Sequence, residues 1–394
     1  MTVPAPRARR RTSMLGRSLP VLLIVALLAP VGLLFASTWR QTGDDRSLAD
    51  RERLGVQYLR ALAPVTEALV EAQSAAVAGR PVPGEPVSRA VEQAATVDAR
   101  IGGQLRSQER WAGLRAKVEA LRDRSPADPE AAYTAYGEVT DLLLALHRKV
   151  RESSGLGRDP GADSFFLQDS AGQKLPEAVV AAGRLADLGA LAARRPAAER
   201  LRSLMGLTGL RVSALSPAGN VVDNLRSAVD SSESTDLGAN VLTPLDAYQR
   251  SVEALALYST PSAAGTIDQG QLAAAALNSR NAARQLQPVI LGELDALLTE
   301  RADGLARDRW LAGGAGVAAA LLLAWLAGML IASGRRARRR AATPDAGSPA
   351  APPPVDPWQP PAPTGQPADP RPLQPVGAAN EPILAQWGPF DASR

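Results

Sequence analysis

Two long uncharged stretches constrain this chain more than any other feature of its sequence. Residues 19–38 and residues 311–334 contain no Asp, Glu, Lys or Arg and are dominated by Leu, Ala, Val and Gly. At about 1.5 Å of rise per residue, a helix over either stretch can cross a hydrocarbon core of about 30 Å. The sequence therefore predicts transmembrane helices over 19–38 and 310–334, with Trp310 in the headgroup region of the second.

Arginine clusters on the outer sides of both stretches predict the orientation. They comprise Arg7, Arg9, Arg10, Arg11 and Arg17 before the first stretch, and Arg335, Arg336, Arg338, Arg339 and Arg340 after the second. Because Lys and Arg are retained in the cytoplasm, residues 1–18 and 335–394 should be cytoplasmic and residues 39–309 extracytoplasmic. A cleavable signal peptide is the alternative for the first stretch, but its apolar run exceeds the usual length of about 7–15 residues. We therefore expect a multi-pass protein of the cell (inner or plasma) membrane, in contact with its lipid.

Composition excludes many kinds of chemistry. The chain has 394 residues, no cysteine and one histidine, so disulfides, thiol nucleophiles and sites with two imidazoles are ruled out. The formal net charge of +4 is accounted for by the two arginine clusters, which makes a nucleic-acid partner unnecessary. We expect no enzyme activity, no cofactor and no metal. The low aromatic content of 4% beside abundant Ala, Leu and Arg favours an all-α fold.

The region 39–309 has helical periodicity interrupted by Pro and Gly. The expected breaks are 80–86, 125–129, 153–163, 195–196, 231–236 and 260–265. A last helix from about Ile267 continues without a breaker into the second apolar stretch, forming a stiff connection into the membrane. About 270 residues exceed one short four-helix bundle, so we expect long helices or two stacked bundles, and favour the stacked arrangement. Gly313, Gly314 and Gly316 would allow close approach of another helix, and we expect a homodimer.

The most distinctive string is 153–169, SSGLGRDPGADSFFLQD, followed by KLPE at 174–177. Asp159-Pro160 and Asp163-Ser164 are typical helix starts, and the apolar residues that follow can anchor a helix in a core. The string resembles the S-N-L-x-L-D-P-D-x-D-S-Y-Y-L-M-D…L-P pattern in the helical extracytoplasmic sensor regions of bacterial methyl-accepting chemotaxis proteins and sensor histidine kinases. Phe165 and Phe166 stand in place of its paired tyrosines.

The resemblance implies a dimeric receptor that binds a small molecule outside the cell and signals across the membrane. The residues it offers for ligand contact are Asp159, Pro160, Asp163, Ser164, Phe165, Phe166 and Asp169, although helix capping and core packing would also explain them. Such receptors continue into a HAMP linker and an output domain. Here a basic cluster and a Pro-rich tail follow, and these contain no histidine to accept a phosphoryl group. The leading hypothesis is therefore a receptor that signals through a separate cytoplasmic partner.

The tail from residue 341 is too rich in Pro, Ala and Gly to bury a core, and we expect it to be disordered. It contains the sequence PPAP at 360–363 and a short apolar segment at 383–387, both of which could dock on a partner. The alternative hypothesis is therefore a structural or adaptor membrane protein that senses nothing and recruits partners through this tail.

Three further candidates carry less weight. The solitary His147 lies in a run of cationic residues and is expected to face solvent. Asp159, Asp163 and Asp169 could bind a hard cation, although capping explains the first two. Four arginines could bind an anion at a helix interface, although their spacing does not place all of them on one face of a helix. They are Arg100, Arg106, Arg110 and Arg115.

Overall fold

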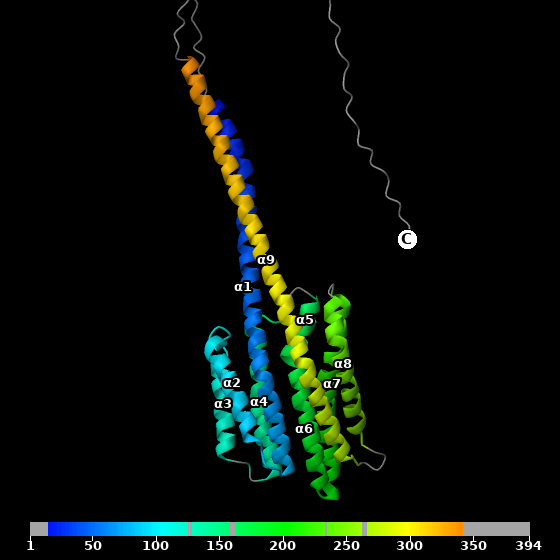
Figure 1. Ribbon diagram of the computed structural model, residues 1–394. Coiled ribbons are helices and arrows are strands. Elements are labelled where there is room, and N and C mark those ends of the chain that lie inside the picture. The colour runs from blue at the N-terminus through cyan, green and yellow to red at the C-terminus, as the bar shows by residue number, and fades with distance from the viewer. Residues whose placement is uncertain are drawn as a thin grey trace, which may run out of the picture. The chain divides into compact units, whose positions relative to one another are not determined.

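The computed structural model of the chain describes residues 15–124, 126, 128–157, 162–232, 235–261 and 266–341. Within these ranges the regular structure is entirely helical, which confirms the all-α prediction (Figure 1). The chain divides into two compact units, residues 1–326 and 327–394, and the packing described below belongs to the first.

Nine α-helices and two short π-helical segments make up the described residues. They are α1 (Leu15–Ala78), α2 (Gly84–Val97), η1 (Asp98–Gly102), α3 (Gln108–Asp123), α4 (Pro129–Ser154), α5 (Ala162–Asp169), η2 (Ser170–Lys174), α6 (Leu175–Arg194), α7 (Ala197–Ser231), α8 (Thr235–Tyr258) and α9 (Gln269–Ala341). Helices α1 and α9 have 64 and 73 residues, so each is long enough to include both a membrane segment and part of the helical domain.

Both ends of α4 have residues typical of helix termini. Before α4, the side chain of Asp128 accepts a hydrogen bond of 2.8 Å from the backbone N–H of Ala131, and Pro129 occupies the first turn. The same helix ends at Gly155, whose φ of 89° lies in the left-handed region that glycine tolerates. All six predicted breaks separate helices in the structure, which confirms them.

One break was missed because nothing but Gly102 and Gly103 marks it. The stretch 87–124 contains no proline and its pattern predicts one helix, yet the chain turns at 103–107 and divides this stretch into α2 and α3. The π-helical segment η1 precedes the turn, and Arg106 adopts a positive φ of 50° within it. The side chain of Asp98 holds this turn, because its Oδ1 accepts hydrogen bonds from Tyr58 Oη at 2.7 Å and Ser107 Oγ at 3.2 Å.

Helix α1 lies between two groups of helices. On one side it packs against α2 and α4, and on the other against α6, which in turn packs against α7. The approach to α6 is close, since a Cβ added at Gly183 would lie 2.5 Å from Val70 Cγ1. One cluster of buried apolar side chains draws residues from all nine described helices.

The two groups lie side by side in Figure 1, with α2, α3 and α4 on one side of α1 and α6, α7 and α8 on the other. This differs from the end-to-end stacking that the length of the region suggested. The shared core is the physical reason, since α1 and α6 bury apolar faces against each other along their sides.

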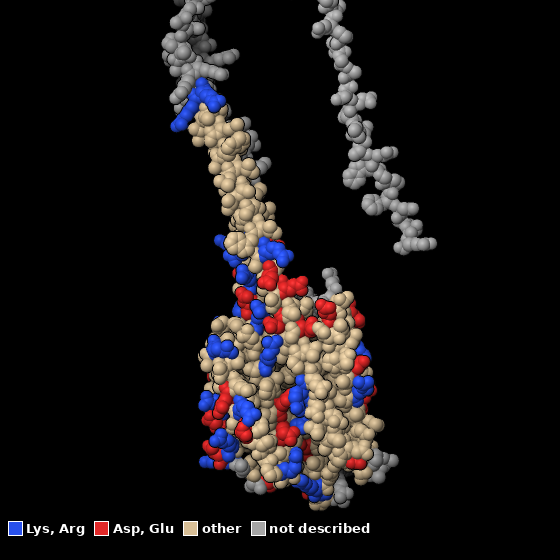
Figure 2. Space-filling view, viewed as in Figure 1, with Lys and Arg blue, Asp and Glu red and all other residues tan. Residues whose placement is uncertain are grey.

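The apolar stretch of α9 is exposed. Among the described residues, α9 alone passes a test for a membrane span by length and hydropathy: the segment Gln269–Ser333 reaches a mean hydropathy of 2.2 over 18 residues, none of them buried. Large apolar side chains such as Leu321, Leu322 and Trp325 are more than half exposed there. Figure 2 shows the contrast between this uncharged segment and the charged surface of the helical domain. One helix of this protein can therefore cross a membrane by length and composition.

The other predicted membrane features are described only in part. The stretch 19–38 belongs to α1, and most of its side chains before residue 28 lie outside the described set. Arg335 and Arg336 are exposed near the end of α9, whereas the side chains of Arg338, Arg339 and Arg340 are not described. Residues 1–14, with Arg7, Arg9, Arg10 and Arg11, and residues 342–394 of the tail lie outside the described residues.

Candidate functional site

The described residues of the sequence motif lie in α5, which continues through η2 into α6. Asp159 and Pro160 are outside the described residues, and the side chain of Asp163 is not described. Ser164 is buried, Phe166 packs against the main core, and Phe165 is 38% exposed. The two phenyl rings meet edge to face at 5.7 Å between centroids.

Asp169 forms the centre of a polar network that joins three helices. Its Oδ1 lies 3.0 Å from Arg151 Nη2 of α4, and its Oδ2 accepts a hydrogen bond of 2.9 Å from Asn224 Nδ2 of α7. Arg151 also donates to Gln173 in η2. Because both carboxylate oxygens of Asp169 already have partners, this part of the motif holds helices together, and ligand binding by the motif remains a prediction.

A cavity lies elsewhere, between α1, α2, α3 and α4. It has a volume of about 860 Å³. Pockets that take small organic ligands commonly have volumes of about 300–1,000 Å³. Apolar side chains from all four helices line it: Leu69 and Ala76 from α1, Val87 and Val91 from α2, Val118 and Leu121 from α3, and Ala132 and Tyr136 from α4. The arrangement can hold a small organic molecule.

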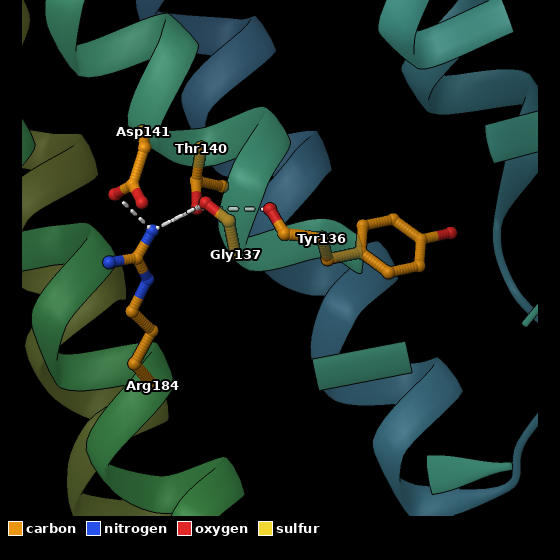
Figure 3. A network of polar contacts seen from close by, with 5 residues as sticks. All are labelled: Tyr136, Gly137, Thr140, Asp141 and Arg184. Carbon is orange, nitrogen blue, oxygen red and sulfur yellow. Dashed lines mark hydrogen bonds and ion pairs between the residues drawn. The ribbon is translucent and has the colours of Figure 1, made fainter. Parts of the chain in front are cut away.

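A second polar network connects the cavity wall to α6. Arg184 Nη2 donates to three oxygens of α4: the backbone oxygen of Gly137 at 2.8 Å, Thr140 Oγ1 at 2.6 Å and Asp141 Oδ1 at 2.7 Å. Thr140 Oγ1 donates in turn to the backbone oxygen of Tyr136 at 3.1 Å. Figure 3 shows the Tyr136 ring on the side of α4 that points away from Arg184. A single turn of α4 thus carries both a cavity-lining ring and an anchor to α6.

Helices α1 and α9 form a continuous antiparallel pair, which we call the α1–α9 seam. Residue numbers fall along α1 as they rise along α9 through the contacts Glu71–Arg280, Glu67–Arg284, Arg60–Leu291, Arg53–Asp295, Trp39–Arg309 and Phe35–Gly316. At 1.5 Å per residue, the seam extends for about 50 Å. The last contacts place the end of the first apolar stretch beside the beginning of the second.

Aromatic side chains of α1 occupy the glycine positions of α9 at this boundary. Phe35 and Trp39 stack at 5.8 Å between centroids, and the Arg309 guanidinium lies 4.6 Å from the Trp39 ring centroid. A Cβ added at Gly316 would lie 3.0 Å from Phe35, and one at Gly313 would lie 3.5 Å from Trp39. Gly314 has no neighbour within 4 Å in the described residues. Two of the three glycines expected to allow close helix approach therefore serve a contact within the chain.

His147 is buried and does not face solvent as its cationic neighbours suggested. It is 1% exposed, and burial lowers its pKa from 6.5 to about 3, so the imidazole is neutral. Its Nε2 lies 3.3 Å from Thr66 Oγ1, and Nδ1 has no hydrogen-bond partner in the described part of the chain. The signal that could have placed it is the buried stripe Leu143, Leu146 and Val150, which shares its face of α4.

Asp187 of α6 is a second buried titratable group. It is 5% exposed, and its Oδ2 accepts a hydrogen bond of 2.8 Å from Gln73 Nε2 of α1. Burial raises its pKa to about 6, against the opposing effects of Gln73, Ser74 and Arg280. Glu71 adds to the rise, because a second negative charge disfavours ionisation. No sequence pattern marked this residue.

The other candidates from the sequence are dispersed. Of the four arginines suggested as an anion site, Arg115 alone lines the cavity, and it is paired with Glu119 at 3.1 Å. Among the described residues, no group of three or more His, Asp or Glu could hold a metal ion. Comparison with family models, with curated proteins and with solved structures found no match.

Proposed function

We propose that this protein is a membrane-anchored receptor that binds a small extracytoplasmic molecule and signals through a separate cytoplasmic partner. The observation that carries the proposal is the cavity of about 860 Å³ beside the end of α1. Helix α1 extends from that cavity to the boundary where it packs against the exposed apolar segment of α9. One helix therefore connects a space for a ligand with the membrane region.

The topology belongs to the same proposal. Two membrane spans, over 19–38 and 310–334, put the helical domain outside and both termini in the cytoplasm. The α1–α9 seam supports this layout, because its last contacts bring the ends of the two apolar stretches to one level. A homodimer would present Gly314 of α9 to a second copy, since Phe35 and Trp39 pack at Gly316 and Gly313.

The proposed mechanism couples occupancy of the cavity to the membrane segments. A ligand in the cavity binds some arrangements of α1, α2, α3 and α4 more tightly than others. Its binding therefore shifts the population toward the arrangement that it fits best. The contact of α4 with α6 through Arg184, and of α1 with α9 through the seam, gives such a change a path to α9. Sliding or tilting of packed helices is a common form of such a transition.

Thermal unfolding of the full chain in lipid nanodiscs tests the proposal. The panel would contain amino acids, aliphatic and aromatic organic acids, purines, nitrate and divalent cations. A compound that binds only the folded state adds about 2.7 kcal/mol of stability at a hundredfold excess over its dissociation constant. A rise in midpoint for one class supports the receptor.

The matched control is Ala95→Trp, which fills the cavity from α2 and should abolish the rise. A flat panel from a protein that unfolds cooperatively would contradict the receptor. It would favour the adaptor alternative, in which deletion of residues 342–394 removes function.

A further inference from the structure

The cavity exists because α2 and α3 do not close against each other. Helix α2 packs on α1 and α3 packs on α4, while the backbones of α2 and α3 hardly approach within 8 Å between Cα atoms. The two helices are joined through η1 and the turn at 103–107, which Asp98 holds in place. This turn sets their separation. A space left open in this way forfeits the apolar burial that the side chains on its walls would otherwise gain.

Each of the four helices contributes apolar side chains to the cavity, beside the charged and polar side chains that also line it. Two faces of α2 differ in their surroundings. Ala90 and Ala94 on one face are buried in the core, whereas Val87 and Val91 on the other line the cavity and are half-buried. Val118 and Leu121 line it from α3 in the same half-buried state. An occupant would cover these side chains, so its body should be apolar.

The charged side chains around the cavity differ in whether they already have an ionic partner within the protein. Arg115 is paired with Glu119, and Asp128 caps α4. Arg122 has no ion-pair partner among the described residues, and Arg80 has Glu71 at the long distance of 4.0 Å. Glu92 is the one lining acid without a described ion pair or cap. The cavity therefore offers a ligand two guanidinium groups, of Arg122 and Arg80, and one carboxylate, of Glu92.

We propose that the cavity binds an amphipathic organic anion, with an apolar or aromatic body between α2 and α3 and a carboxylate facing Arg122 and Arg80. Guanidinium groups suit a carboxylate because they donate two parallel hydrogen bonds to it. The proposal rests on the receptor function proposed above and names the ligand class of the same cavity.

The test uses three probes with the same ring system and different charge: 1-naphthylacetate, 1-naphthylacetamide and 1-naphthylmethylamine. Binding to the full chain in nanodiscs is followed by naphthyl fluorescence anisotropy, with empty nanodiscs subtracted. We expect the acetate to bind at least about tenfold more tightly than the amide, the size of one charge-assisted hydrogen bond. The cation should bind most weakly.

Charge variants separate the cavity from a general effect of surface charge. Arg122→Gln and Arg80→Gln should each weaken the acetate and leave the amide unchanged, and Glu92→Gln should strengthen the acetate. Arg124→Gln is the matched control, because Arg124 is an exposed arginine at the end of α3 that does not line the cavity. It should change nothing.

Equal binding of the three probes, or preference for the amine, overturns the anion assignment while the receptor stands. The same holds if a compound of another class raises the unfolding midpoint and none of the probes binds. If no probe and no panel compound binds the folded chain, the receptor function itself fails.

Discussion

Glu71 Oε2 of α1 lies 2.8 Å from Arg280 Nη2 of α9, in a pair whose arginine side chain is only 12% exposed. These residues are 209 positions apart in the chain. This contact is the first of the α1–α9 seam, which ends at the contact between Phe35 and Gly316 in the two apolar stretches. The two longest helices of the described chain are therefore aligned from the helical domain to their apolar stretches.

The glycine positions of the seam give the first prediction. Gly316→Leu should separate α1 from α9, because even a Cβ at this position would lie 3.0 Å from the Phe35 ring. Gly314→Leu is the matched control, since Gly314 has no described neighbour within 4 Å. The measurement is chemical crosslinking of cysteines introduced at Gly43 and Arg309, a pair that is unique because the chain has no cysteine.

The yield of the crosslink between positions 43 and 309 of one chain should fall in Gly316→Leu and stay unchanged in Gly314→Leu. Equal yields in the two variants would show that the seam does not depend on the glycine at 316. If Gly314→Leu lowers crosslinking between chains instead, that result supports the proposed homodimer.

Asp187 should make the protein more stable as the pH falls through about 6. Its folded pKa of about 6 exceeds the ordinary value of 3.8, so the folded state binds the proton more tightly. Its ionisation then destabilises the fold above pH 6, by an amount on the order of 3 kcal/mol. Asp187→Asn should be more stable than the native chain at pH 8, with the difference shrinking toward pH 4. Urea unfolding at several pH values measures it, and a difference that is constant with pH contradicts the prediction.

His147 should have the opposite effect on the pH dependence of stability, making the protein less stable as the pH falls. Its folded pKa of about 3 lies below the ordinary value of 6.5, so the unfolded state takes up the proton first. The stability linked to His147 is complete above pH 6.5 and is lost as the pH falls toward 3. His147→Leu should lose less stability than the native chain between pH 7 and pH 4.5. The same unfolding series tests this, and parallel curves for the two proteins would refute it.

Sequence reasoning located the helices better than it located the polar groups that connect them. Pro and Gly act locally, so breaks such as 80–86 and 195–196 could be placed without knowing the fold. The turn at 103–107 was missed because it depends on Tyr58, a residue 40 positions away from its partner Asp98. Contacts of that range cannot be inferred from local patterns.

In the candidate site, too, local features could be predicted from the sequence and contacts between distant residues could not. Helix α5 begins at Ala162, inside the motif, and Asp169 at its end joins α4, α5 and α7. The cavity between α1, α2, α3 and α4 could not be anticipated, because it depends on the separation of α2 and α3. His147 was misplaced because its neighbours in the sequence are cationic, whereas its neighbours in space are apolar.

Arg184 provides a test of the connection between the cavity wall and α6. Arg184→Met should destabilise the fold by about 1–3 kcal/mol, because Thr140 and the Gly137 carbonyl lose a charged donor. Asp141→Asn is the control, since Asp141 is 66% exposed and a surface pair contributes about 0–1 kcal/mol. Chemical denaturation of both variants measures the difference. A cost for Asp141→Asn equal to that of Arg184→Met would show that the exposed ion pair, and not the contact with Thr140, carries the effect.

Crosslinking of the α1–α9 seam with and without ligand measures whether the cavity is coupled to the apolar stretches of α1 and α9. The full chain with cysteines at 43 and 309 is reconstituted in nanodiscs, and the crosslinking rate is measured with the compound that most raises the unfolding midpoint. We expect the compound to change the crosslinking rate in this protein and to leave it unchanged when Ala95→Trp fills the cavity. A compound that raises the unfolding midpoint but leaves the crosslinking rate unchanged would show that the cavity and the seam are not coupled.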